Sequence, residues 1–368
     1  MTERTRHGLI IGKFCPPHAG HHVLIRGAAA ASERVTVLVL ARSDDPVPLE
    51  RRIAWLSEVH AADANVTVAG AVDDHPDDFA DPAIWDVHMA VIDAGISSVT
   101  TEPVTAVFSS ETYGAELARR IRATNVVVDV ERTLEPISAT EIRADLVANW
   151  EHLAEPTRGG LSTPVVVIGA ESTGKTTLSR ALADALRARG GAHGLTRWVP
   201  EHGRPFTIDK LGAARAVAGV AGLPLPTMND LVWTTDEFEH IARTQNHLED
   251  AASRIGGPAL ICDTDSFATA IWHERYLGAP SPAVEALTRH HPLYLLTHHE
   301  DVPFAQDGIR DGEAIRSWMT NRFVEALAAS GRRTVVLRGS HEERVDTGLA
   351  AIDAVVSTSL RERRWSTR

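Results

Sequence analysis

Cysteine and basic residues are both scarce in this chain of 368 residues. Its two cysteines, Cys15 and Cys262, are too few for the disulfide framework of a secreted protein or for a zinc site of their own. Lys and Arg number 37 against 49 Asp and Glu, and the formal net charge of −12 argues against a broad nucleic-acid-binding face. We therefore expect a protein of the reduced cytosol, with no nucleic-acid partner, whose basic side chains bind individual phosphate groups.

Long apolar segments are absent as well. No run is long enough to span a bilayer, and the polar residues 1–7 lack the features of a signal peptide. There is also no room for a helix-turn-helix ahead of the first predicted strand. The remaining composition, 43% hydrophobic and 23% charged, is that of a globular protein, and the length suits two domains. We expect a cytoplasmic protein without a membrane partner, and the sequence is compatible with a homo-oligomer.

Alternating strand and helix patterns predict an α/β fold with two parallel sheets. Residues 1–154 predict an open Rossmann-like sheet, which binds ligands at the carboxyl ends of its strands. Residues 155–163 lose the periodicity and gather Pro, Gly, Ser and Thr, so they are predicted as a linker, and residues 164–368 predict the second sheet. The predicted strands are 8–14, 34–41, 65–71, 104–109 and 125–130 in the first sheet, and 165–168, 259–262, 293–297 and 334–337 in the second.

A first phosphate-binding motif follows the first predicted strand. The run Gly-Lys13-Phe-Cys-Pro-Pro-His18-Ala-Gly20-His21 puts two imidazoles and unbonded backbone N–H groups at the start of a predicted helix. Such a helix N-terminus binds anions. The competing interpretation is that the two histidines are ordinary surface or capping residues.

A second motif in the same domain favours the phosphate site. Ile-Ser138-Ala-Thr140-Glu141-Ile-Arg143 follows the last predicted strand and offers two hydroxyls and a guanidinium, which suit the outer phosphates of ATP. Ser138 with Glu141 also reads as a simple capping box. The two motifs, in this order and at opposite ends of one domain, favour binding over capping.

Together these motifs resemble the nucleotidylyltransferase superfamily. The resemblance implies attack by a substrate phosphate on the α-phosphorus of ATP, with release of pyrophosphate and no covalent intermediate. Catalysis would come from positioning and charge neutralisation. The implied ligands are His18, His21 and Lys13 beside the α-phosphate, with Gly20 in the turn, and Ser138, Thr140 and Arg143 around the β- and γ-phosphates.

Arg51, Arg52 and Trp55 form a candidate acceptor site on a predicted helix. An arginine could clamp the acceptor's phosphate while a tryptophan one turn later stacks on its ring. The alternative is an amphipathic helix with a half-buried tryptophan. Weaker candidates follow the fourth strand: Ser110, Glu111 and Tyr113.

A P-loop follows the first strand of the second sheet. Gly169-Ala-Glu-Ser-Thr-Gly174-Lys175-Thr176 stands between an apolar strand and a helical pattern, the context in which this motif binds phosphates. Lys175 would reach the β and γ oxygens, and the Thr176 hydroxyl would bind Mg²⁺. The predicted ATP-binding residues here are Gly169, Glu171, Ser172, Thr173, Gly174, Lys175, Thr176 and Thr177.

Downstream residues favour a kinase over a switch or a motor. Asp263 and Asp265 end a predicted strand, where a carboxylate orders the metal. Glu201 could accept a substrate hydroxyl proton while Arg204 steadies the phosphates, and the residues leave open whether Asp265 or Glu201 is the base. Residues 306–310 resemble a mobile lid that contributes Asp307 and Arg310, with Arg316 and Arg322 behind it.

The full set of motifs resembles the bifunctional nicotinamide-mononucleotide adenylyltransferase and ribosylnicotinamide kinase family, the NadR type, over nearly the whole chain. The resemblance implies phosphorylation of ribosylnicotinamide with ATP and Mg²⁺, then adenylylation of the mononucleotide to NAD and pyrophosphate. Some members carry an N-terminal DNA-binding domain, which we do not expect here. Where the family tends to have a tryptophan as a platform for the pyridine ring, this chain has Phe304; Trp272 and Tyr276 are further aromatic candidates.

Two alternatives remain at the level of the sequence. One is an adenylyltransferase or cytidylyltransferase for another acceptor, such as a phosphopantetheine-like one, fused to an unrelated P-loop kinase. The other is a regulatory protein that senses a nucleotide without turnover. The paired carboxylates and the arginine-rich lid speak against a pure sensor.

Overall fold

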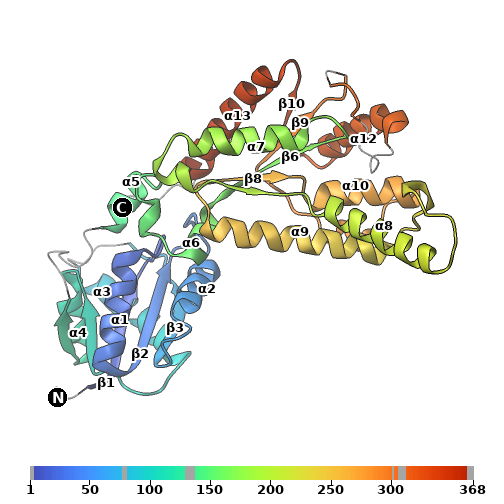
Figure 1. The fold of residues 1–368 in the computed structure, drawn as a ribbon. Helices are drawn as coiled ribbons and strands as arrows, with labels where there is room; N and C mark the ends of the chain where they lie inside the picture. The colour runs from blue at the N-terminus through green and yellow to red at the C-terminus, as the bar shows by residue number, and fades with distance from the viewer. Residues whose placement is uncertain (1–3, 77–80, 129–136, 301, 306–311, 363–368) are drawn as a thin grey trace. The chain divides into compact units, whose positions relative to one another are not determined.

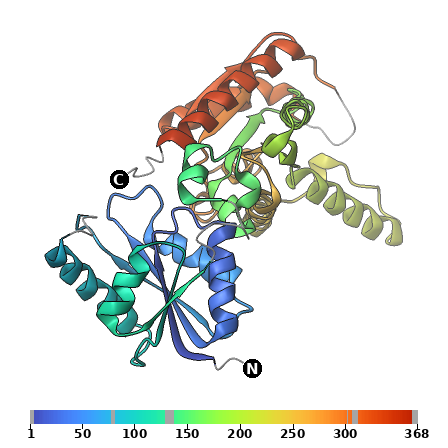
Figure 2. The same cartoon turned by 90° about the vertical axis from the view of Figure 1, so that its left-hand side faces the viewer.

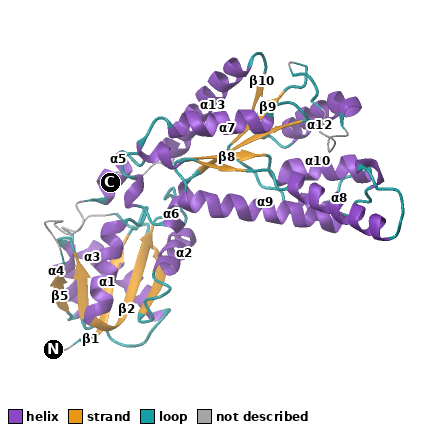
Figure 3. Cartoon of the chain, in the orientation of Figure 1, coloured by secondary structure: helices purple, strands orange, loops and turns teal. Residues whose placement is uncertain are grey.

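The computed structural model describes residues 4–76, 81–128, 137–300, 302–305 and 312–362 (Figure 1). The chain forms two compact units, one of Met1–Thr157 with Leu360–Arg368 and the other of Arg158–Ser359. Each unit contains a five-stranded parallel sheet with helices packed against it, so the predicted α/β class with two sheets is confirmed (Figure 3). Among the described residues, no helix has both the length and the apolar character needed to cross a membrane.

The first sheet has the strand order β3-β2-β1-β4-β5, with helices on both faces (Figure 2). Adjacent residues of one strand point to opposite faces: Ile10 packs with Leu24 and Ile25, whereas Leu9 packs with Trp85 and Ile92. Its elements are β1 (Thr5–Gly12), α1 (Ala19–Ala31), β2 (Ser32–Ala41), α2 (Leu49–Val59), β3 (Val66–Val72), α3 (Pro82–Ser97), β4 (Ala106–Ser109), α4 (Tyr113–Ile121), β5 (Thr124–Val127) and α5 (Ala139–Ala144).

The region predicted as a linker is partly helical. Residues 155–161 form α6 (Glu155–Leu161), in which Thr157 and Leu161 are buried. Pro156 stands in the first turn of α6, where its missing N–H has no partner to lose. The Pro and Gly content that suggested an open linker is thus accommodated in one short helix.

The second sheet has the order β10-β9-β6-β8-β7, which puts the P-loop strand β6 in the middle. A core of side chains from β6, β8, β9, α10 and α12 fills one face, and α7 packs on the other. Its main elements are β6 (Thr163–Gly169), α7 (Lys175–Arg187), β7 (Arg197–Val199), α8 (Gly203–Val220), α9 (Thr235–Ile255), β8 (Ala259–Asp263), α10 (Ser266–Leu277), α11 (Pro282–Glu285), β9 (Leu293–Thr297), α12 (Arg316–Ala329), β10 (Thr334–Leu337) and α13 (His341–Glu362).

Candidate active sites

The P-loop turns from β6 into α7 through backbone conformations that suit glycine. Gly174 has a φ of 82° at the N-cap of α7, and Ser172 has a φ of 56°. At Gly169, a Cβ would overlap the Thr297 side chain and lie 2.7 Å from the Thr297 carbonyl oxygen. Lys175 Nζ donates a hydrogen bond to the Ala170 carbonyl oxygen at 2.9 Å, which keeps the ammonium over the loop.

A cavity of about 450 Å³ opens beside the P-loop. Its size is in the usual range for a small-molecule site. Its polar lining includes the P-loop residues Glu171 to Thr177, Glu201 and Arg204. Its aromatic lining consists of Trp233, Phe238, Trp272 and Tyr276. This mixture of groups suits a ligand that has both phosphates and a flat ring.

Thr176 lines the cavity, and its side chain lies beside the buried Asp263 carboxyl group. Burial raises the pKa of Asp263, while the Thr176 side chain and the charge of Lys175 oppose the rise. Among the described residues, Asp263 Oδ1 has no hydrogen-bond partner although it is buried. A hydroxyl beside a carboxylate oxygen that still needs a partner is a donor set that Mg²⁺ prefers.

Of the two carboxylates considered as kinase base, only Glu201 lines the cavity. Burial raises the pKa of Glu201, and the charge of Lys175 opposes this. Asp265 is fully buried at the N-cap of α10, where Oδ1 accepts from Ala268 N at 2.9 Å. The Asp265 side chain therefore points into the core. Of the two carboxylates, Glu201 is the better placed to act as the kinase base.

The predicted lid, residues 306–310, lies outside the described residues, and this includes Asp307 and Arg310. Of the arginines behind it, Arg316 Nη2 donates to the Ser172 carbonyl at 3.1 Å and to the Val302 carbonyl at 2.9 Å. Arg322 pairs with Glu274, at 2.9 Å between Nε and Oε2. In this structure Arg316 supports the backbone of the P-loop, and Arg322 belongs to a salt bridge between α10 and α12.

The sequence predicts Phe304 as the platform for the pyridine ring. Phe304 is outside the lining of the cavity and stacks near the Arg316 guanidinium, 5.5 Å from the ring centroid. Sequence reasoning missed Trp233 and Phe238, whose rings lie 5.3 Å apart. Trp233 precedes α9 in an irregular segment, so no periodic pattern marked it. Gln245, also in the lining, was missed because it reads as one polar residue of a long helix.

In the first unit, the two motifs meet at the carboxyl ends of the strands. A cavity of about 460 Å³ is lined by Lys13 and His21 from the first motif and by Ser138, Thr140 and Arg143 from the second. A smaller pocket of about 70 Å³ shares His21 and Ser138 with it and adds His18 and Gly20. The weaker candidates Ser110, Glu111 and Tyr113 also line the larger cavity. Residues more than 100 positions apart in the sequence thus surround one space.

His18 and His21 are arranged by the start of α1. His18 is the N-cap of the helix, its backbone N donates to His21 Nδ1 at 3.3 Å, and the two ring centroids are 3.8 Å apart. At Gly20, a Cβ would lie 3.2 Å from the His18 ring. A glycine at this position therefore lets the ring pack closely over the turn.

The second motif forms a capping box in the structure. Ser138 Oγ accepts from Glu141 N at 3.1 Å, and Ser138 N donates to Glu141 Oε2 at 2.8 Å, which is a capping box. Ser138 nevertheless faces the cavity, as do Thr140 and Arg143, with Arg143 Nη2 3.3 Å from Thr140 Oγ1.

The helix with the candidate acceptor residues does not line either pocket. Arg52 is fully buried and donates to the Lys13 carbonyl at 2.7 Å and to Asp45 Oδ2 at 2.6 Å. Trp55 is buried and Arg51 is exposed. In this structure Arg52 supports the loop that carries Lys13. The cavity wall contains Trp85 instead, which sequence reasoning did not single out.

Comparison with known proteins agrees with this arrangement. The family described as AAA domain matches residues 164–344. The trifunctional NAD biosynthesis/regulator protein NadR of Salmonella typhimurium is 24% identical over 336 residues, which cover 87% of this chain and 76% of the relative. That alignment spans both units. The chain is homologous to NadR over most of its length.

Solved NadR proteins share the fold of this chain over nearly all of its length. A crystal structure of NadR in complex with NR matches with a TM-score of 0.69 and 21% identity, covering 96% of each chain. A NadR structure in complex with NAD and AMP-PNP matches with a TM-score of 0.68 and the same identity and coverage. The family resemblance inferred from the motifs is therefore confirmed.

Proposed function

We propose that this chain catalyses two consecutive ATP-dependent steps of NAD synthesis. The second unit phosphorylates ribosylnicotinamide, and the first unit adenylylates the resulting mononucleotide. The observation that carries the proposal is that each unit has its own cavity of about 450–460 Å³ with a phosphate-binding motif in its wall. The ligands of the NadR crystal structures, NR in one and NAD with AMP-PNP in the other, support the choice of substrates.

In the kinase step, Glu201 accepts the proton of the ribose 5′-hydroxyl as its oxygen attacks the γ-phosphorus of ATP. The bond from the γ-phosphorus to the β–γ bridging oxygen breaks, and ADP leaves. Lys175 and the amides of the P-loop bind the phosphates, and Arg204 lines the same cavity. The pyridine ring of ribosylnicotinamide carries a positive charge, so it suits aromatic lining residues such as Trp233 and Tyr276.

Mg²⁺ fits the kinase site. Thr176 and Asp263 would hold it, because their side chains lie side by side and Asp263 Oδ1 needs a partner. When bound, the ion neutralises charge on the β- and γ-phosphates.

In the adenylylation step, the phosphate of the mononucleotide attacks the α-phosphorus of a second ATP, and pyrophosphate leaves. His18, His21 and Lys13 neutralise the charge that develops on the α-phosphate oxygens. Thr140 and Arg143 hold the outer phosphates and so orient the leaving group. The reaction needs no covalent intermediate, which agrees with a site made of donors and cations.

The test uses the purified chain with ATP, Mg²⁺ and ribosylnicotinamide, followed by chromatography. The proposal predicts mononucleotide and ADP first, then NAD and pyrophosphate. If neither nucleotide product forms, the proposal is wrong. A panel that includes a phosphopantetheine acceptor separates a different nucleotidylyltransferase, and slow ATP hydrolysis that no acceptor stimulates would indicate a nucleotide sensor. We also propose a cytosolic location, where the two buried thiols, Cys15 and Cys262, stay reduced.

A further inference from the structure

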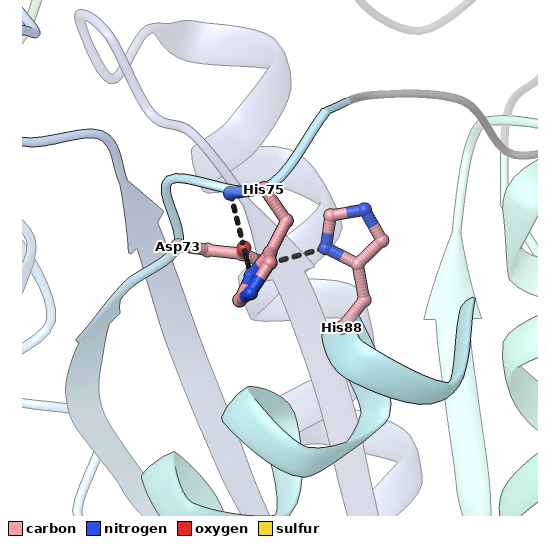
Figure 4. Close-up of side chains that lie close together, drawn as sticks. All are labelled: Asp73, His75 and His88. Carbon is pink, nitrogen blue, oxygen red and sulfur yellow. Dashed lines mark hydrogen bonds and ion pairs between the residues drawn. The ribbon is translucent and has the colours of Figure 1, made fainter. Parts of the chain in front are cut away.

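Three potential metal ligands meet beyond the end of strand β3. Asp73 follows β3 directly, His75 is two residues further, and His88 comes from α3 (Figure 4). One ligand atom from each residue lies within 4.8 Å of the other two. Neither phosphate-binding motif includes them, and sequence reasoning did not identify them.

Asp73 is at the centre of the group. Its Oδ1 lies 2.9 Å from His75 Nδ1, and its Oδ2 lies 2.5 Å from His88 Nδ1. Asp73 and His88 are 8% and 5% exposed, whereas the His75 side chain is 41% exposed. Two of the ligands are therefore fixed in the protein interior and the third closes the group from the solvent side.

The two ring nitrogens of His88 have different neighbours. Nε2 lies 3.0 Å from the Pro76 carbonyl oxygen, to which a protonated Nε2 would donate. Nδ1 lies 2.5 Å from Asp73 Oδ2. In the tautomer with the proton on Nε2, the Nδ1 lone pair faces the carboxylate, and the two groups can bind one metal ion together. A bond from the remote ring nitrogen to a backbone carbonyl is also how proteins orient histidines that bind metals.

The donor set selects the kind of metal. Two imidazole nitrogens and one carboxylate oxygen suit Zn²⁺ and related transition metals, whereas Mg²⁺ and Ca²⁺ prefer oxygen ligands alone. With bonds of about 2.0–2.2 Å, ligand atoms of a tetrahedral zinc site lie about 3.3 Å apart. The present separations of 2.5 and 2.9 Å would thus have to widen by less than about 1 Å.

We propose that Asp73, His75 and His88 form a binding site for Zn²⁺ or a related divalent transition metal. Three protein ligands leave a fourth position for water or a ligand oxygen. Asp73 and His88 both line the 460 Å³ cavity of the first unit, so an oxygen of a molecule in that cavity is within reach of the site. The site is separate from the proposed Mg²⁺ ligands Thr176 and Asp263, which belong to the other unit.

The test measures metal binding by the full chain without substrates. After treatment with a chelator and desalting, the chain is titrated with Co²⁺, a coloured substitute for Zn²⁺, and the bound Zn²⁺ is counted in a parallel sample. We expect one ion per chain with the intense visible absorption of four-coordinate Co²⁺. His75→Ala and Asp73→Asn should each lose that ion and its absorption.

The controls address folding and unspecific binding. His75 is largely at the surface, so His75→Ala should fold normally, and Asp73→Asn keeps the shape of the side chain. His290→Ala removes an exposed histidine of the second unit and should bind the metal like the parent chain. If the parent binds no ion, or if His75→Ala and His290→Ala bind as much as the parent, the group is a charged hydrogen-bond network and the proposal is wrong. Because no substrate is present, this result is independent of the proposed enzymatic function.

Discussion

The Tyr294 hydroxyl donates a hydrogen bond to Asp265 Oδ2 at 2.9 Å, deep in the core of the second unit. The other carboxylate oxygen accepts from the Ala268 backbone at the start of α10. With both oxygens engaged, Asp265 links β9 to α10 and has no access to the cavity. This relationship separates two carboxylates that the sequence presents as equivalent candidates for the kinase base.

Glu201→Gln should lower kcat of the kinase step by roughly 100-fold or more, because a general base typically contributes about 10²–10⁴. Asp265→Asn can still cap α10, and it should leave kcat within a few-fold of the parent. Steady-state kinetics with ribosylnicotinamide checks both variants. A large loss of kcat in a folded Asp265→Asn chain, with Glu201→Gln fully active, would assign the base to Asp265.

The pH dependence of stability should reflect Asp265. Burial raises its pKa to about 6 from an ordinary 3.8, although His291 nearby partly opposes this. Between these values the folded chain binds more protons than the unfolded chain, so the free energy of unfolding falls as pH rises. Asp265→Asn does not titrate at this position, so its free energy of unfolding lacks this dependence on pH. The free energy of unfolding of the variant minus that of the parent should therefore rise by roughly 1–2 kcal/mol from about pH 4.5 to about pH 7.

Calorimetric melting of the second unit's transition at both pH values measures this difference. Comparing the variant with the parent largely cancels the titration of other groups. An equal stability difference at the two pH values would show that Asp265 does not titrate in this window.

Gly169→Ala should destabilise the second unit by roughly 2–5 kcal/mol and remove kinase activity, because the new Cβ would overlap Thr297 and the φ of 155° disfavours alanine. Gly212→Ala is the matched control. Gly212 is an exposed residue of α8 with no atom within 4 Å of the added Cβ, so its variant should be neutral or slightly more stable. Thermal melting compares them, and equal stability of the two variants would contradict the close packing at Gly169.

Trp233→Leu should raise KM for ribosylnicotinamide roughly 10-fold with little change in kcat, because a stacked cationic ring contributes about 0.5–2 kcal/mol. Trp233 lines the cavity, whereas Phe304 does not. Phe304→Leu should therefore leave KM nearly unchanged. Initial rates measure both variants. If Phe304→Leu raises KM and Trp233→Leu does not, Phe304 is the ring platform.

The fold was largely predictable because parallel sheets bury both faces and their strands read as apolar runs between helices. The P-loop after the central strand β6 was predictable because its backbone geometry depends on a few neighbouring residues. The spacing of those residues can be recognised directly in the sequence. The boundaries were less accurate: the predicted strand 8–14 is β1 (Thr5–Gly12), because the chain turns at Phe14 with a φ of 45°. Helix α6 was missed because seven residues are too few to show a period.

The site was predictable where one short motif carries the chemistry and less so where packing brings distant residues together. Trp233 and Tyr276 lie 5.1 Å apart although they are 43 positions apart in the sequence; Tyr276 was among the aromatic candidates, whereas Trp233 has no local signature. Arg52 reads like a surface phosphate ligand, yet Asp45 and two backbone carbonyls satisfy it inside the protein. Sequence spacing gives the face of a helix, but it does not say whether that face meets a cavity or the core.

The most direct test of two separate, consecutive sites is product analysis of two single variants, Lys175→Ala and His18→Ala, with ATP and Mg²⁺. Lys175→Ala should form no mononucleotide from ribosylnicotinamide but should still convert supplied mononucleotide to NAD. His18→Ala should accumulate mononucleotide and form little or no NAD. Each retained activity also reports that the variant is folded. If either substitution abolishes both activities in a folded chain, the two reactions do not have independent sites and the account is contradicted.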